Sequence, residues 1–150
     1  MARIPATKTR EADVISLLAA LARAHQKFSL FDAELHRLAV SGLTAPQAKV
    51  IFCLGNTDGL PCSEITEQTL ITKGTLTGVI DRLEAKGLVQ RWGDSNDGRK
   101  IIVDLTRLGQ RVFLREHPRY LEQMNSRLKT FSTRDLEQAT ALLNRIAGQF

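Results

Sequence analysis

The fold is decided by the stretch Thr72-Lys73-Gly74-Thr75-Leu76-Thr77-Gly78-Val79-Ile80-Asp81-Arg82-Leu83. Its apolar residues recur at the i, i+3, i+4, i+7 spacing of an amphipathic helix, and they are Leu76, Val79, Ile80 and Leu83. Thr72 is a suitable N-cap, and Gly87 a natural stop. The opposite face is unusually small and rich in hydroxyl groups for a helix that meets only solvent. The pattern therefore predicts a helix with one core face and one face open to a partner.

Shorter elements flank this helix. Thr44, with Pro46 in the first turn, begins a short apolar helix that ends near Gly55, and Ser63 begins a second that ends near Leu70. After the central helix, two β-rich runs, 88–92 and 101–105, enclose the turn 93–98 and predict a hairpin. This order of short helix, short helix, exposed helix and hairpin is that of a winged helix-turn-helix, whose second helix enters the DNA major groove.

Long helices are predicted on both sides of this lobe. Apolar spacing predicts a helix over 11–40, and Thr106 begins another that Pro118 should bend. Ser132 or Thr133 caps a last helix. We expect a single domain over 1–150, mainly α with a β-hairpin wing, in which 43–106 form the DNA-binding lobe. The helices of 11–40 and 108–150 carry more apolar surface than one chain can cover, which predicts a homodimer.

Composition limits the class of protein. The 150 residues are 43% hydrophobic and carry a formal charge of +5, which favours a polyanionic partner, and 107–150 hold eight basic residues against four acidic ones. Two cysteines without metal-binding spacing, no long apolar run and no signal peptide predict a cytoplasmic protein with no metal, cofactor or membrane contact. The three histidines show no catalytic spacing, so we expect no enzyme; they are His25, His36 and His117.

Five fragments resemble the MarR family of transcriptional regulators, in the family's order and spacing. They are Leu43-Thr44-Ala45-Pro46-Gln47, Thr72-Lys73-Gly74-Thr75-Leu76-Thr77, Asp81-Arg82-Leu83-Glu84-Ala85-Lys86-Gly87-Leu88-Val89, Asp97-Gly98-Arg99-Lys100 and Leu105-Thr106. The resemblance covers roughly residues 11–148. It implies a dimeric transcriptional regulator, which we expect to be a repressor, that reads a pseudo-palindromic operator in double-stranded DNA, with half-sites about 10 base pairs apart.

The resemblance also implies roles for single residues. The wing-tip arginine of the family, here Arg99, enters the minor groove, and Asp97 resembles the acid that braces the wing, with Arg82 as one partner. Many members have two successive arginines after that acid, whereas this chain has Gly98 and then Arg99. The predicted DNA-binding residues are Ser63, Thr72, Lys73, Thr75, Thr77, Arg82, Arg99 and Lys100.

Each of these residues has a purely structural alternative. Arg82 could pair with Glu84 or Asp81 on its own helix, and Asp97-Gly98 is a common hairpin turn in its own right. The four arginines of 107–119 recur every four residues and could simply be a solvated helix face. A winged helix that binds only protein is a second functional reading of the same fold.

Control by a small molecule is the last prediction. The resemblance implies a small, often anionic aromatic effector between the dimer helices and the winged lobe. His25, Phe28 and Asp32 share one helix face and are candidate ligands, although a core aromatic between surface polar residues is the alternative. A thiol sensor competes with this reading; we expect Cys53 to be an inert core thiol and Cys62 to be exposed.

Overall fold

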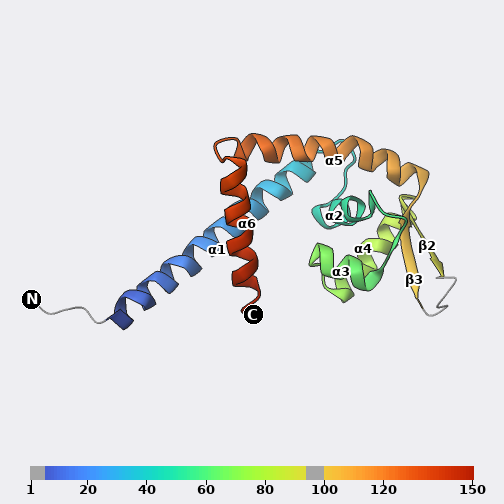
Figure 1. The fold of residues 1–150 in the computed structure, drawn as a ribbon. Helices are drawn as coiled ribbons and strands as arrows, with labels where there is room; N and C mark the ends of the chain where they lie inside the picture. Colours follow the sequence, from blue (N-terminus) through green and yellow to red (C-terminus); the bar gives the residue numbers. More distant parts are fainter. Residues whose placement is uncertain (1–5, 94–99) are drawn as a thin grey trace, which may run out of the picture.

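The computed structural model describes residues 6–93 and 100–150. In chain order, the elements are α1 (Ala6–Leu38), α2 (Ala45–Leu54), β1 (Leu60–Pro61), α3 (Cys62–Thr69), α4 (Lys73–Ala85), β2 (Val89–Gly93), β3 (Ile101–Leu105), α5 (Arg107–Leu128) and α6 (Thr133–Ala147). Helices α2, α3 and α4 and the strands form one lobe under one end of α5, while α1 and α6 extend away from it (Figure 1). The winged helix-turn-helix architecture predicted from sequence is confirmed.

Helix α1 differs from the predicted 11–40 at both ends. It begins at Ala6, because the next residues contain no glycine or proline that would interrupt a helix. It ends at Leu38, where the backbone turns and the Gly42 amide donates to the Ala39 carbonyl. Gly42 has a φ of 62°, a conformation that glycine adopts without the steric cost that a Cβ brings.

The sheet has three antiparallel strands in the order β1-β3-β2. The hairpin of β2 and β3 follows the prediction, with Val89 opposite Leu105 and Gly93 opposite Ile101. Strand β1, which pairs Leu60 with Val103, was missed, because two residues ending in a proline carry no alternating pattern. Strand β1 thus joins the segment before α3 to strand β3 of the wing.

The core of the lobe lies among its three helices and the sheet. Its fully buried side chains come from α2, α3, α4 and the strands, and include Val50, Ile51, Leu54, Ile65, Leu76, Ile80, Leu83, Val89 and Val103. Helix α4 buries the stripe predicted from its spacing. Packing of that stripe leaves the other face of α4 at the surface.

Helix α5 begins directly after β3, with Thr106 as its N-cap. The Thr106 side chain accepts a hydrogen bond from the Gly109 amide and donates to the Gly87 carbonyl, so one residue caps α5 and fixes the end of α4. The helix continues through Pro118 to Leu128 as one element rather than being divided there. Its outer half lies alongside α1, where Arg127 stacks over the Phe31 ring at 4.5 Å.

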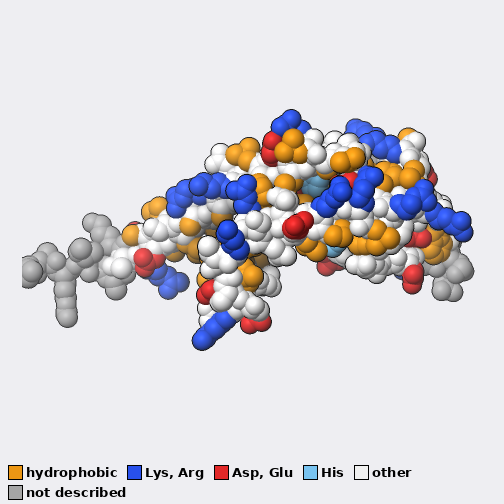
Figure 2. Space-filling view, turned by 90° about the horizontal axis from the view of Figure 1, so that it is seen from above, with side chains coloured by type: hydrophobic (Ala, Val, Ile, Leu, Met, Phe, Trp, Pro, Cys, Tyr) orange, Lys and Arg blue, Asp and Glu red, His pale blue; other side chains and the backbone are white. Residues whose placement is uncertain are grey.

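Helices α1 and α6 leave much apolar surface open within the single chain. Every described α6 side chain but Ile146 is exposed, and Ser132 caps the helix by accepting from the Asp135 amide. From above, hydrophobic side chains show between Lys and Arg along this part of the molecule (Figure 2). The large exposed apolar residues of α1 and α6 include Val14, Ile15, Leu17, Leu18, Phe28, Leu30, Leu136, Leu142 and Leu143. In the described part of the chain, none of the helices combines the length and apolar character needed to span a bilayer.

A Gly109→Ala change should destabilise the protein. A Cβ at this position would lie 2.0 Å from the Leu88 carbonyl oxygen, which is backbone and cannot rotate away. We expect a loss of about 1–3 kcal/mol in the free energy of unfolding, measured by urea denaturation at fixed protomer concentration. Gly78→Ala is the matched control: nothing lies within 4 Å of that Cβ, so stability should stay or rise by up to about 1 kcal/mol. Equal losses in both variants would contradict this packing.

Candidate nucleic-acid interface

A tight turn at Leu70 connects α3 to α4. Leu70 caps α3 in the left-handed conformation, with a φ of 56°, and its amide donates to the Thr66 carbonyl at 2.9 Å. Ile71 then turns inward and Thr72 occupies the N-cap of α4. Leu70 is 87% exposed, so the turn places a large apolar side chain at the surface beside the start of α4. The left-handed leucine has no signature in the sequence, because glycine or asparagine is usual there.

The open face of α4 carries two glycines, although no contact within the described part of the chain requires glycine there. A Cβ at Gly74 or at Gly78 would meet no atom within 4 Å. Glycine inside a helix costs about 1 kcal/mol of stability relative to alanine. Two glycines on an open face, without any internal contact that demands them, indicate that another molecule approaches this helix closely.

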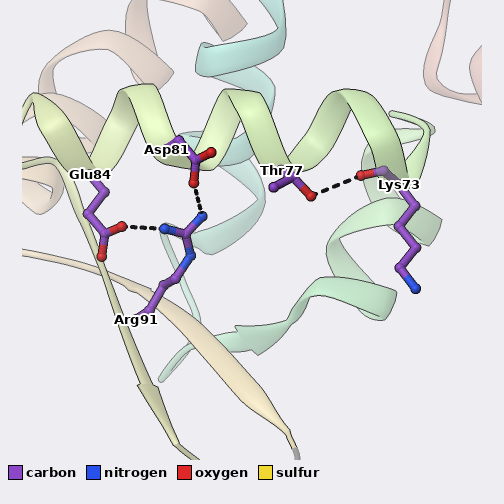
Figure 3. Close-up of polar contacts among 5 residues, drawn as sticks. All are labelled: Lys73, Thr77, Asp81, Glu84 and Arg91. Atoms are coloured by element: carbon purple, nitrogen blue, oxygen red, sulfur yellow. Dashed lines mark hydrogen bonds and ion pairs between the residues drawn. The ribbon is translucent and has the colours of Figure 1, made fainter.

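Threonine hydroxyls on this face are held by local hydrogen bonds. Thr77 Oγ1 donates to the Lys73 carbonyl at 3.3 Å (Figure 3), and Thr72 Oγ1 donates to Thr75 Oγ1 at 3.0 Å. Thr72 makes no side-chain cap hydrogen bond to the helix backbone. The Lys73 side chain extends away from the helix at its first turn, where free amides and the helix dipole attract anions.

The two acids of α4 are paired with an arginine from the wing. Arg91 on β2 reaches Asp81, with Nη2 2.5 Å from Oδ1, and also bonds Glu84 (Figure 3). The hydrogen bond that Arg91 donates to Asp81 raises the pKa of the Arg91 guanidinium, and Glu84 adds to this effect. Among the described residues this arginine, rather than Arg82, is the partner of both acids, so the alternative pairing of Arg82 is wrong.

Three of the remaining predicted contact residues are exposed. Ser63 is exposed in the first turn of α3, Arg82 is exposed near the end of α4, and Lys100 is exposed just before β3. Asp97 and Arg99, the predicted brace and wing-tip residues, lie outside the described residues. Of the described site residues, most therefore lie on α4 or its N-cap, while Ser63 lies on α3 and Lys100 before β3.

A separate cavity lies between the lobe and the arm, which consists of α1 together with the part of α5 that contacts it. Its volume is about 290 Å³, and it is enclosed by the end of α1, the loop after it, α2 and α5. His36, Phe52, Glu116, Arg119 and Tyr120 are among its lining residues. The stacked His36 and Tyr120 rings, with centroids 5.5 Å apart, give it an aromatic wall.

None of the three predicted effector residues is among those that line this cavity. His25 and Phe28 are exposed on α1, and Phe28 is not a core aromatic. Asp32 is buried, accepts a hydrogen bond from Tyr120 at 2.9 Å and lies 3.4 Å from His36 Nε2. Burial, with Asp32 as the second cause, raises the pKa of Tyr120. Sequence reasoning missed this network, because Tyr120 is 88 residues from Asp32.

Both cysteines are half-buried. The Cys53 thiol donates to Gln68 Oε1 at 3.3 Å, and burial, together with the charge of Glu64, raises its pKa. A raised pKa lowers the fraction of reactive thiolate. The expected exposure of Cys62 is wrong, because its side chain packs against the core cluster.

Comparisons place this geometry among known regulators. A family model described as "MarR family" matches residues 43–101. The homoprotocatechuate degradative operon repressor of Escherichia coli is 29% identical over 101 residues, 67% of this chain and 68% of that protein. A probable transcriptional regulator from Pseudomonas aeruginosa is 29% identical, with a TM-score of 0.69 over 85% of this chain and 93% of that one.

A third similar structure belongs to a protein whose DNA binding is regulated by a small molecule. Bordetella bronchiseptica BpsR, described with a mechanism for regulation of its DNA binding by 6-hydroxynicotinic acid, is 25% identical. Its TM-score is 0.72 over 88% of this chain and 98% of that chain.

A Lys73→Gln change should weaken binding to duplex DNA of any sequence. If Lys73 neutralises one phosphate, the slope of log K against log salt concentration becomes shallower by roughly one. Fluorescence anisotropy with a 30-base-pair duplex between 50 and 200 mM KCl measures this slope. Lys129→Gln, at the far end of α5, removes the same charge and should leave it unchanged. An unchanged slope for Lys73→Gln would remove this contact.

Proposed function

The chain belongs to the MarR family of winged helix-turn-helix transcriptional regulators, and from that premise we propose that it is a dimeric repressor released from its operator by a small anionic aromatic compound. The observation that carries the DNA-binding part is the open face of α4, where Gly74 and Gly78 leave room that the chain itself does not use. Because such a regulator acts at the chromosome, we place it in the cytoplasm.

In the proposed complex α4 enters the major groove. Thr75 and Thr77 present methyl and hydroxyl groups to base edges, and Ser63, Thr72 and Lys73 lie at helix starts where backbone amides favour phosphate. Arg82 and Lys100 add charge beside them. The wing contact of Arg99 and the brace of Asp97 are carried over from the family resemblance.

Dimerisation is proposed from the uncovered apolar faces. Leu142 and Leu143 of α6 are 53% and 51% exposed, and Ile15 of α1 is 67% exposed. An isolated chain would leave this surface in water, whereas a second copy can cover it with the same surface. Two-fold symmetry then presents two α4 helices to half-sites about 10 base pairs apart.

A Leu143→Glu change should shift the protein from dimer toward monomer. The new carboxylate would be buried without a partner in the proposed interface, which is strongly unfavourable. Sedimentation velocity at micromolar concentration measures the change, and Glu137→Gln on the same helix is the control that should remain dimeric. A natural chain that sediments as a monomer at these concentrations would refute dimerisation.

The proposed effector site is the cavity between the lobe and the arm. Arg119 supplies a positive charge, His36 a ring nitrogen, and Phe52 and Tyr120 aromatic surface for a planar ring. Regulation of BpsR by 6-hydroxynicotinic acid, an aromatic acid, supports this class of ligand. A ligand here would contact both α1 and α5 on one side and α2 of the lobe on the other.

Salicylate-like aromatic acids should release the protein from an operator selected from random oligonucleotides, and the selected site should be a pseudo-palindrome. Arg119→Gln should raise the acid concentration for half-release roughly tenfold, because an ionic contact is lost. Gel shift measures release. Arg111→Gln, two helical turns before Arg119 and outside the cavity lining, is the control that should respond like the natural chain.

Two outcomes would contradict this proposal. Release by peroxide that a Cys62→Ser change abolishes, with no response to any acid, would establish a thiol sensor instead. Failure to select any sequence, together with no binding to the promoter next to its own gene, would favour the protein-interaction reading.

A further inference from the structure

The DNA-facing helix carries two carboxylates that should oppose its function. Asp81 and Glu84 lie three residues apart on α4, and their side chains are 58% and 42% exposed. A free carboxylate beside DNA phosphates is repelled, and like charges across an interface are costly. Lys73, Arg82 and Lys86 oppose these two acids, so α4 and its C-cap alone carry a net charge of only +1.

Arg91 reaches these acids from the wing. Its planar guanidinium engages both carboxylates at once, Nη2 with Asp81 at 2.5 Å and Nη1 with Glu84 (Figure 3). The fork of a guanidinium matches two acceptors on neighbouring turns, which a lysine ammonium cannot do with the same geometry. The Arg91 side chain is only 26% exposed, so it is held between β2 and α4.

We propose that Arg91 is a positioning residue for DNA recognition: it neutralises Asp81 and Glu84 on the DNA face and ties strand β2 of the wing to α4. This inference rests on the proposed placement of α4 in the major groove. In this role Arg91 acts through the two acids rather than through DNA, because its terminal nitrogens are already engaged with carboxylates. With Arg91 included, the local net charge rises from +1 to +2.

The test compares Arg91→Gln in two backgrounds, using the full chain. The first background is the natural chain, and the second carries Asp81→Asn and Glu84→Gln, which remove the charges that Arg91 is proposed to neutralise. Affinity is measured by anisotropy on the selected operator and on a scrambled duplex, over a range of salt concentrations. Urea denaturation of every variant is run alongside. Arg145→Gln on α6 is the matched control for loss of one arginine.

We expect Arg91→Gln to weaken binding to both duplexes roughly tenfold in the natural background and by less than about twofold in the acid-free background. The loss in the natural background should shrink as salt screens the two carboxylates. Arg145→Gln should leave affinity unchanged.

Other results would overturn the inference. Equal losses in both backgrounds would mean that Arg91 contacts phosphate directly. The acid-free variant could instead lose as much affinity as Arg91→Gln, with a matching fall in its free energy of unfolding. That result would mean that the contact of Arg91 with the two acids is a structural brace alone. No binding by the natural chain to either duplex would instead reject the DNA-binding function itself, and this inference with it.

Discussion

The burial of one helical stripe determines most of the functional surface. Leu76, Val79, Ile80 and Leu83 are each at most 3% exposed, and their packing fixes the rotation of α4 about its axis. A helix whose rotation is fixed has a fixed outer face, so the positions of Thr75 and Thr77 follow from core packing alone. Full burial of each such side chain contributes roughly 1.5–3 kcal/mol, so this orientation is among the most strongly determined features of the lobe.

A second set of contacts joins the lobe to the arm. Tyr120 of α5 bonds Asp32 of α1, His36 stacks on the Tyr120 ring, and Phe52 of α2 lies within 6.0 Å of the His36 ring centroid. These contacts surround the cavity, and they connect the helix that precedes the lobe with the helix that follows it. A molecule bound there would press on the contacts that set the angle between lobe and arm.

The sequence predicted the parts of the fold that depend on local pattern. The α4 stripe, the hairpin and the caps at Thr106 and Ser132 all follow from spacing and residue type, and the structure confirms them. Contacts between distant residues were beyond such reasoning. The local sequence does not indicate that Tyr120 contacts Asp32. The ion pair of Arg91 with Asp81 could be recognised only once the hairpin was placed against α4.

The length of α1 has a mechanical consequence. A helix of 33 residues is about 50 Å long, and the buried residues among its described side chains lie at the end near His36, where it packs against the lobe and α5. In the proposed dimer it would therefore act as a lever with its pivot beside the cavity. A tilt of about 5° at that pivot would carry the far end through about 4 Å, which approaches the rise of one helical turn. In the proposed dimer, a sub-ångström adjustment around a bound ligand would thus be magnified along α1 into a displacement of several ångströms at its far end.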